Sequence, residues 1–194
     1  MIGNTPTIEW MESATILIQD YTGDTVTVIN DSPNYIIHPE ISPYTCVSIR
    51  GDGNCLFRAI SRGVTGTERY HMSVRLAICS FMTNIENAVV LAYHSLSSPV
   101  DPWTCDTAVL AMRSYITTSR MDQEGTWGTE KEIFAAASLF QLTINVSVLS
   151  PTNERSWHVF KPLLSNNTCL EQFNVNLYLF HTNKRNHYDL IFPS

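Results

Sequence analysis

Basic residues are absent from the first 49 positions of this 194-residue chain. This segment holds six acidic residues, whereas the 12 basic and 12 acidic residues that follow it balance, so the net charge of −6 belongs to the segment alone. Without lysine or arginine it lacks the basic start of a secretory signal and the Arg-rich face of a transit peptide. The rest of the sequence offers only the short pair Lys184-Arg185 as a basic cluster. We therefore expect no nucleic-acid partner, because binding to phosphate backbones normally needs a basic patch.

Paired cysteines and long apolar runs are also missing. The five cysteines form no CxxC pair, so they are a poor match to a zinc site or a disulfide framework; they are Cys46, Cys55, Cys79, Cys105 and Cys169. We expect reduced thiols and a cytoplasmic location. The longest nearly uninterrupted apolar run, residues 133–142, is roughly half as long as a membrane-spanning helix. We therefore expect no membrane partner.

The first 45 residues differ in pattern from the rest. Two β-branched runs, residues 14–18 and 25–29, flank a turn whose Gly23 suits a tight reversal, and this arrangement predicts a β-hairpin. Three prolines between residues 31 and 44 then predict an extended connector. We expect residues 1–45 to form an acidic N-terminal extension with this hairpin, and residues 46–194 to form one main domain.

Helical patterns come first in the main domain, and strand patterns follow. The spacing of apolar residues predicts helices that begin at Cys55 and span residues 68–84, 107–118 and 129–140, with Arg75 on a solvent-facing side. Thr129 and Glu132 match a capping box at the start of the last helix. Alternating, β-branched runs predict strands at residues 144–149, 157–161, 176–181 and 187–192. This order indicates an α+β or mixed layered domain.

A glycine-rich loop precedes Cys55, the first residue of a predicted helix. Unpaired N–H groups and the helix dipole at such a position favour a thiolate, which is the reactive form of a cysteine nucleophile. The amides of residues 52–55 could also hold an oxyanion beside the sulfur. A glycine turn before a buried cysteine is common for packing reasons alone, and the local pattern by itself favours that interpretation.

A thiol nucleophile needs a base, and six histidines are available. His187 and Asp189 are two positions apart on a predicted strand, so both side chains lie on one face and Asp189 could orient the imidazole. The same pattern also fits an ordinary strand with one polar face, and the two interpretations are compatible. His181, on the preceding strand or in its turn, is the rival base.

Three motifs in order resemble a known family. Asp52-Gly53-Asn54-Cys55-Leu56-Phe57-Arg58-Ala59 strongly resembles the nucleophile motif of the ovarian tumour (OTU) cysteine proteases, and His187-Tyr188-Asp189 resembles their C-terminal histidine motif. Trp127-Gly128, the helix at 129–140 and the strand at 144–149 are similar to the middle block of that family, although Thr129 stands where many members have glycine. The resemblance covers about residues 45–193 and leaves the first 45 uncovered.

The resemblance implies a papain-like cysteine protease fold, with helices packed around a small mixed β-sheet. It also implies a deubiquitinase that needs no cofactor and cleaves isopeptide bonds made by ubiquitin or a ubiquitin-like modifier. Cys55 matches the nucleophile, His187 the general base and Asp189 the orienting acid. Asp52 matches a position that helps to form the oxyanion loop or, in some members, serves as the acid.

Three further residues are expected to bind substrate on the same basis: Gly53, Asn54 and Trp127. For Trp127, a core or groove-wall ring is at least as good an interpretation as direct substrate contact. Two other functions stay open. One is a ubiquitin-binding module that keeps the fold without turnover, and the other is thiol chemistry on a different acyl group, as in a deamidase or an ordinary peptidase.

Overall fold

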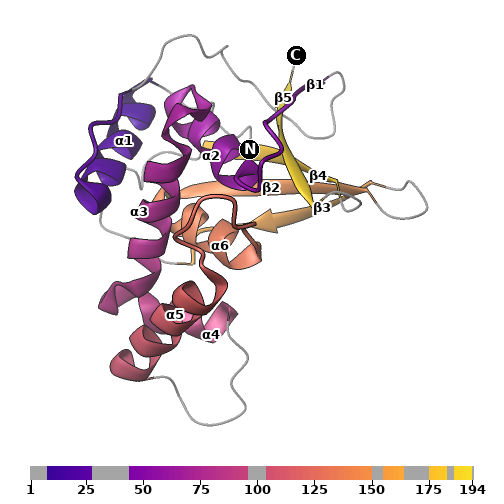
Figure 1. Ribbon diagram of the computed structural model, residues 1–194. Helices are drawn as coiled ribbons and strands as arrows, with labels where there is room; N and C mark the ends of the chain where they lie inside the picture. Colours follow the sequence, from indigo (N-terminus) through magenta and orange to yellow (C-terminus); the bar gives the residue numbers. More distant parts are fainter. Residues whose placement is uncertain are drawn as a thin grey trace.

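The fold is a five-stranded mixed sheet packed against helices, as seen in a computed structural model (Figure 1). The structure describes residues 8–27, 44–95, 104–149, 155–163, 175–182 and 186–193. The strands are β1 (Tyr44–Val47), β2 (Leu142–Leu149), β3 (Arg155–Phe160), β4 (Val175–Thr182) and β5 (His187–Pro193). The helices are α1 (Ile8–Thr22), α2 (Cys55–Thr65), the 3₁₀ turn η1 (Glu68–Tyr70), α3 (His71–Thr83), α4 (Ile85–Ser95), α5 (Cys105–Ser119) and α6 (Glu130–Leu139).

The sheet order is β1-β5-β4-β2-β3. Only β2 and β4 run parallel among these pairs, and the other neighbours are antiparallel. The β4–β5 ladder ends where Thr182 pairs with His187, and on its other side β5 pairs with β1. His187 therefore stands at the very start of a central strand, next to the turn that enters it.

Helices α2 and α6 contact the sheet, and α3 contacts each of the other five α-helices. Helix α2 lies so close to β4 that a side chain at Gly63 would collide with Leu177. Apolar side chains of α2, including Phe57 and Ile60, are fully buried between the sheet and α3. This packing fixes the N-terminus of α2, where Cys55 lies, relative to β5. The predicted fold class, an α+β domain with a small mixed sheet, is confirmed.

The main domain follows the predicted pattern in most places. The helices begin and end within a few residues of the expected bounds, and the Thr129–Glu132 capping box forms at the start of α6. Two elements were not predicted. Helix α4 follows directly after α3 because the Asn84 side chain accepts the N–H of Glu86 and starts a new turn, and β1 is a short strand whose formation depends on its pairing with β5.

The predicted N-terminal β-hairpin is wrong. Residues 8–22 form helix α1, and Gly23, expected at the tip of a hairpin, instead ends the helix with a positive φ of 74°. Its N–H donates to the Gln19 carbonyl, which closes the last turn. The buried residues of α1 recur at helical spacing: Trp10, Met11, Ala14, Thr15 and Ile18. Burial of this stripe against α2 and α3 outweighs the strand preference of the β-branched residues.

The second run of that hairpin and the predicted connector lie mostly outside the described residues. Residues 23–27 form no regular element, and the structure describes nothing from residue 28 to residue 43. The division of the chain at residue 45 stays a prediction.

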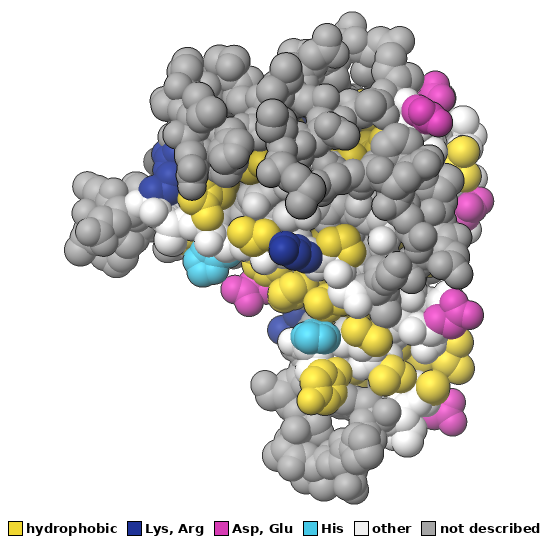
Figure 2. Space-filling model, turned by 180° about the vertical axis from the view of Figure 1, so that it is seen from behind, with side chains coloured by type: hydrophobic (Ala, Val, Ile, Leu, Met, Phe, Trp, Pro, Cys, Tyr) yellow, Lys and Arg dark blue, Asp and Glu magenta, His cyan; other side chains and the backbone are white. Residues whose placement is uncertain are grey.

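Exposed apolar side chains gather on the outer helices. Figure 2 shows hydrophobic side chains over the lower part of the molecule, where α4 and α5 lie, and Ile85, Tyr93 and Leu110 of these helices are exposed. Within the described part of the chain, no single helix has the length and hydropathy to cross a membrane. Residues 68–83 and 85–94 reach those values only as a pair, and that pair is bent by 90°.

A pair of substitutions in α1 separates the helix from a strand. Ile18 is fully buried and Ile16 is 55% exposed, whereas both would share one face of a strand. We expect Ile18→Ala to lower the free energy of unfolding by about 2–4 kcal/mol, and Ile16→Ala to stay within about 0.5 kcal/mol of the starting protein. Urea unfolding followed by circular dichroism measures both values. Equal losses for the two variants would contradict the helix.

Candidate active site

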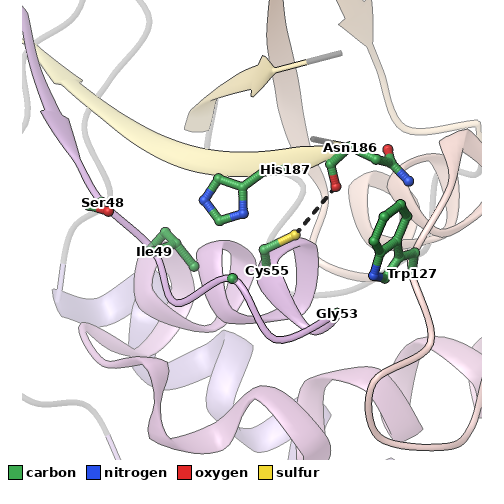
Figure 3. A pocket seen from close by; sticks show the side chains of 8 residues that line it. Ser48, Ile49, Gly53, Cys55, Trp127, Asn186 and His187 are labelled. Carbon is green, nitrogen blue, oxygen red and sulfur yellow. Dashed lines mark hydrogen bonds between the residues drawn. The ribbon is translucent and has the colours of Figure 1, made fainter. Parts of the chain in front are cut away.

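A cavity of about 340 Å³ opens where the N-terminus of α2, the start of β5 and the loop before α6 meet (Figure 3). The residues lining it are Ser48, Ile49, Gly51, Gly53, Cys55, Trp127, Asn186 and His187. Four of the residues that the sequence singles out as site residues are in this lining. The other four were not predicted as site residues: Ser48, Ile49, Gly51 and Asn186. For Asn186 the available signal was its place in a polar turn directly before His187.

Cys55 is the first residue of α2, and its side chain is buried at the base of the cavity. Its thiol donates to the carbonyl of Asn186 over a sulfur–oxygen distance of 3.9 Å. Burial raises the pKa of the Cys55 thiol, although the N–H groups of Tyr188, Leu56 and Cys55 itself act in the opposite direction. Loss of hydration therefore opposes the helix N–H groups, which by themselves favour a thiolate, and in the structure the thiol donates to the Asn186 carbonyl.

His187 and Asp189 lie on the same face of β5, as their spacing predicts. The imidazole Nε2 is 3.0 Å from Asp189 Oδ1, and the N–H of Ile49 donates to the same oxygen at 2.8 Å. Because a carboxylate accepts, Nε2 carries the proton in the neutral ring and Nδ1 keeps its lone pair. Figure 3 shows the ring beside the Cys55 side chain. The second nitrogen of His187 is therefore available to the thiol.

Asp52 is engaged elsewhere. Its carboxylate accepts from Arg58, with Nη2 2.6 Å from Oδ2 and Nε 3.2 Å from Oδ1, and it also accepts the N–H of Asn54. The hydrogen bonds from Arg58 lower the pKa of Asp52 to about 2. Of the two candidate acids, the structure thus places Asp189 on the histidine and pairs Asp52 with an arginine. Asp52 holds the loop in front of Cys55.

Asn54 faces the interior rather than the cavity. Its side-chain oxygen accepts the N–H of Gly125 and an Nη2–H of Arg75, both at 2.8 Å. Asn54 is 2% exposed and its side-chain oxygen is occupied, so the side chain is not turned toward the cavity, and substrate binding by Asn54 stays a prediction. Its role here is to tie the N-terminus of α2 to the loop around Gly125.

Arg75 is fully buried, which contradicts its expected solvent-facing position on α3. It donates to the carbonyls of Met121 and Thr126 at 2.8 and 2.7 Å, in addition to Asn54. Its guanidinium also lies 3.8 Å from the centre of the Phe57 ring. Desolvation lowers the pKa of Arg75, but these acceptors and the aromatic face hold the cation in the interior.

The Trp127 ring forms one wall of the cavity and is 52% exposed, so it fits a groove wall rather than a core position. The loop before it touches the nucleophile loop directly. Gly53 has a φ of 83°, and a side chain there would collide with the carbonyl of Gly125. A side chain at Gly128 would meet Leu56 and Phe57 of α2. Contact with the Gly125 backbone explains the glycine at position 53, and contact with the side chains of α2 explains the glycine at position 128.

His181, the rival base, does not line the cavity. Its Nε2 is 3.0 Å from the side-chain oxygen of Asn186, and its ring stacks on Tyr188 with centroids 4.4 Å apart. The structure therefore brings His187, and not His181, to Cys55. Among the described residues, no group of three or more His, Cys, Asp or Glu side chains could hold a metal ion.

The sequence of the main domain matches a known protein family. Residues 50–188 match the family OTU, described as OTU-like cysteine protease. The chain belongs to this family. The match includes Cys55 and His187, and it begins after the acidic segment, so the OTU family match leaves helix α1 and strand β1 uncovered.

Solved OTU structures share the fold at low sequence identity. The OTU domain of OTUD1 is 20% identical with a TM-score of 0.51, and the alignment covers 77% of this chain and 85% of that one. The viral OTU domain protease from Qalyub virus is 18% identical with a TM-score of 0.51, covering 78% and 85%. The corresponding protease from Farallon virus is 17% identical with a TM-score of 0.52, covering 87% and 97%. No curated protein matches the sequence.

Replacing Arg75 tests its part in this OTU site. Arg75→Met removes three hydrogen bonds and leaves buried carbonyl groups without a donor, so we expect a loss of about 3–5 kcal/mol in the free energy of unfolding. Arg62→Met is the matched control, since Arg62 makes a partly exposed ion pair with Glu68 at 3.7 Å and should matter by about 1 kcal/mol or less. Similar values for both variants in urea unfolding would contradict the assignment.

The Asp52–Arg58 pair predicts a specific pH dependence of stability. The pKa of Asp52 is lowered from an ordinary 3.8 to about 2, so the pair stabilises the fold above about pH 4, and this contribution is lost as the pH falls toward 2. We expect Asp52→Asn to be less stable than the starting protein at pH 6, by about 1–2 kcal/mol, and the two free energies of unfolding to converge near pH 2. Urea unfolding at a series of pH values measures this difference. A gap that is constant with pH would contradict the prediction.

Proposed function

We propose that this OTU family member is a deubiquitinase that hydrolyses the isopeptide bond between a lysine and the C-terminal glycine of ubiquitin or a ubiquitin-like modifier. The observation that carries the proposal is the line of contacts from Asp189 to His187, beside the Cys55 thiol in an open cavity. Family membership supports a cysteine protease, and the motifs around Cys55 and His187 support the modifier as its substrate. Cys55 lines a cavity and must stay reduced to act as a nucleophile, which suits a reducing compartment such as the cytoplasm.

The reaction begins with proton transfer from the Cys55 thiol to Nδ1 of His187. Burial raises the pKa of the Cys55 thiol, which donates to the Asn186 carbonyl, so we assign His187 the role of a general base that takes the thiol proton during the attack. Asp189 keeps Nε2 protonated and stabilises the imidazolium that forms. The thiolate attacks the glycyl carbonyl, the lysine amine leaves with the proton from His187, and water hydrolyses the thioester.

Stabilisation of the oxyanion falls to the N-terminus of α2. The N–H of Asp52 donates to the Arg50 carbonyl, and the N–H of Asn54 donates to the Asp52 carboxylate, so neither is free for an oxyanion. Cys55 is the first residue of α2, where N–H groups have no partner within the helix, and its N–H belongs to the residue whose sulfur would attack. We therefore assign the oxyanion to the Cys55 amide, and not to the Asp52 amide.

The walls of the cavity suit a glycine at the scissile bond. Gly51 lies beside the His187 ring, so that a Cβ added at Gly51 would be 3.5 Å from Nδ1, and Gly53 lies against Gly125. Neither wall carries a side chain that could reach into the cavity, and Trp127 lines the opposite side. Walls built from glycines leave room for an extended substrate backbone next to Cys55.

A ubiquitin with a C-terminal electrophile tests the proposal. We expect a covalent adduct on Cys55, detected as a mass increase, that is absent in Cys55→Ala and is formed at least about 100-fold more slowly in His187→Ala. The same electrophile on a free glycine peptide is the control for general thiol reactivity. Binding of ubiquitin without an adduct would contradict the enzyme and favour the non-catalytic binding module.

The two candidate acids are separated by matched substitutions. Asp189→Ala removes the acceptor for Nε2 of His187 and should lower kcat for a ubiquitin–lysine isopeptide about 10- to 100-fold, with little change in KM. Asp52→Ala breaks the pair with Arg58 and should lower kcat by less than about threefold, although it reduces stability. Circular dichroism confirms that both variants are folded at the assay temperature. If Asp52→Ala abolished activity while Asp189→Ala left kcat unchanged, the orienting acid would be Asp52 and not Asp189.

A further inference from the structure

The residue before the base, Asn186, has an unusual conformation. Its φ is 44°, in the left-handed region, where asparagine is one of the few side chains found with any frequency. Its carbonyl accepts the Cys55 thiol, and its side-chain oxygen is 3.0 Å from Nε2 of His181. One residue thus joins the nucleophile on α2, the base on β5 and a histidine on β4 (Figure 3 shows its carbonyl facing the sulfur).

His181 is well fixed to hold this turn. It pairs across the β4–β5 ladder with Tyr188, and its ring stacks on the Tyr188 ring with centroids 4.4 Å apart and planes 27° from parallel. Tyr188 is itself 7% exposed, so the His181 ring packs against a buried side chain. Because the amide oxygen of Asn186 accepts, Nε2 of His181 must carry a hydrogen. Stacking aims that N–H at Asn186.

We propose that His181 is a positioning residue of this catalytic centre, acting through Asn186. Its N–H fixes the Asn186 side chain, and this holds the Asn186 peptide group against the Cys55 thiol and sets where β5, and with it the His187 ring, begins. His181 does not contact substrate or exchange a proton with the thiol. Any effect of His181 on substrate turnover rests on the proposed function.

The charge state of His181 does not decide this role. Nε2 of His181 donates in the protonated ring as well as in the neutral tautomer that the contact requires. The described titratable groups around the turn are His187, Tyr188 and Asp189 on β5 and Cys55 on α2, and Glu130 and Glu132 of α6 act on Tyr188. Loss of His181 should therefore lower the reactivity of Cys55 without moving its pH dependence, whereas loss of the base His187 should change the shape of that dependence.

Alkylation of Cys55 by iodoacetamide tests the proposal without any substrate. The rate is followed by mass spectrometry of the Cys55 peptide from pH 6 to pH 9, with the exposed Cys105 as reference for reagent and the buried Cys79 as a marker of unfolding. We expect His181→Leu to lower the Cys55 rate at pH 7 about fivefold to tenfold, and His181→Gln, which keeps an N–H donor of similar reach, to stay within twofold. His158→Leu, at an exposed position on β3, should not change it.

A second route to the same bond covers the case in which His181→Leu fails to fold. Asn186→Gly removes the acceptor but tolerates the positive φ, so it should lower the Cys55 rate to a similar extent. Where His181→Leu folds, its effect and that of Asn186→Gly should not add in the double variant, because both act on one contact. Cys55 rates in His181→Leu or Asn186→Gly that equal those of the starting protein, with Cys79 still protected, would overturn the proposal.

The outcome for the proposed function is read separately. If the starting protein forms no adduct with the ubiquitin electrophile, the deubiquitinase proposal fails, while the iodoacetamide rates still decide the role of His181. If the adduct forms, its rate in His181→Leu should fall by the same factor as alkylation, and His181→Gln should restore it. Equal adduct rates in all three proteins would overturn the positioning role and leave the deubiquitinase intact.

Discussion

One buried cation, the Arg75 guanidinium, sets the relation between the parts of this site. It stands on α3, yet it bonds to Asn54 at the entry to α2 and to the carbonyls of Met121 and Thr126 in the loop that precedes Trp127. A buried charge is unfavourable unless its hydrogen-bonding groups are met, so the three segments can pack here only in an arrangement that supplies these acceptors. The floor and the Trp127 wall of the cavity are thereby fixed to the same helix.

The rest of the site builds on that frame. Gly53 and Gly125 can touch through their backbones because Asn54 accepts from both Arg75 and the Gly125 amide. The base then comes from the sheet, where Ile49 of the segment after β1 donates to the same oxygen of Asp189 that His187 uses. Two supports of different kinds, a buried ionic network among helices and a hydrogen-bonded sheet, therefore meet at Cys55.

Local signals predicted what depends on neighbours in sequence. The capping box of α6, the start of α2 at Cys55 and the shared face of His187 and Asp189 all follow from spacings of a few residues. Long-range packing decided the rest. An arginine within an amphipathic helix resembles a solvent-facing residue until its acceptors, contributed by distant loops, are known, and the β-branched run in α1 resembles a strand until its partner helices are known. The raised pKa of the Cys55 thiol likewise comes from burial, which depends on packing and not on the local start of a helix.

The place of β5 in the sheet governs when the parts of this site can come together during synthesis of the chain. Asn186 follows Cys55 by 131 residues, and the strand that begins just after it must enter between β1 and β4. A ribosome-bound chain that has not yet reached residue 187 carries the thiol but neither its base nor the acid. Cys55 therefore meets His187 and Asp189 only after β5 has entered the sheet between β1 and β4.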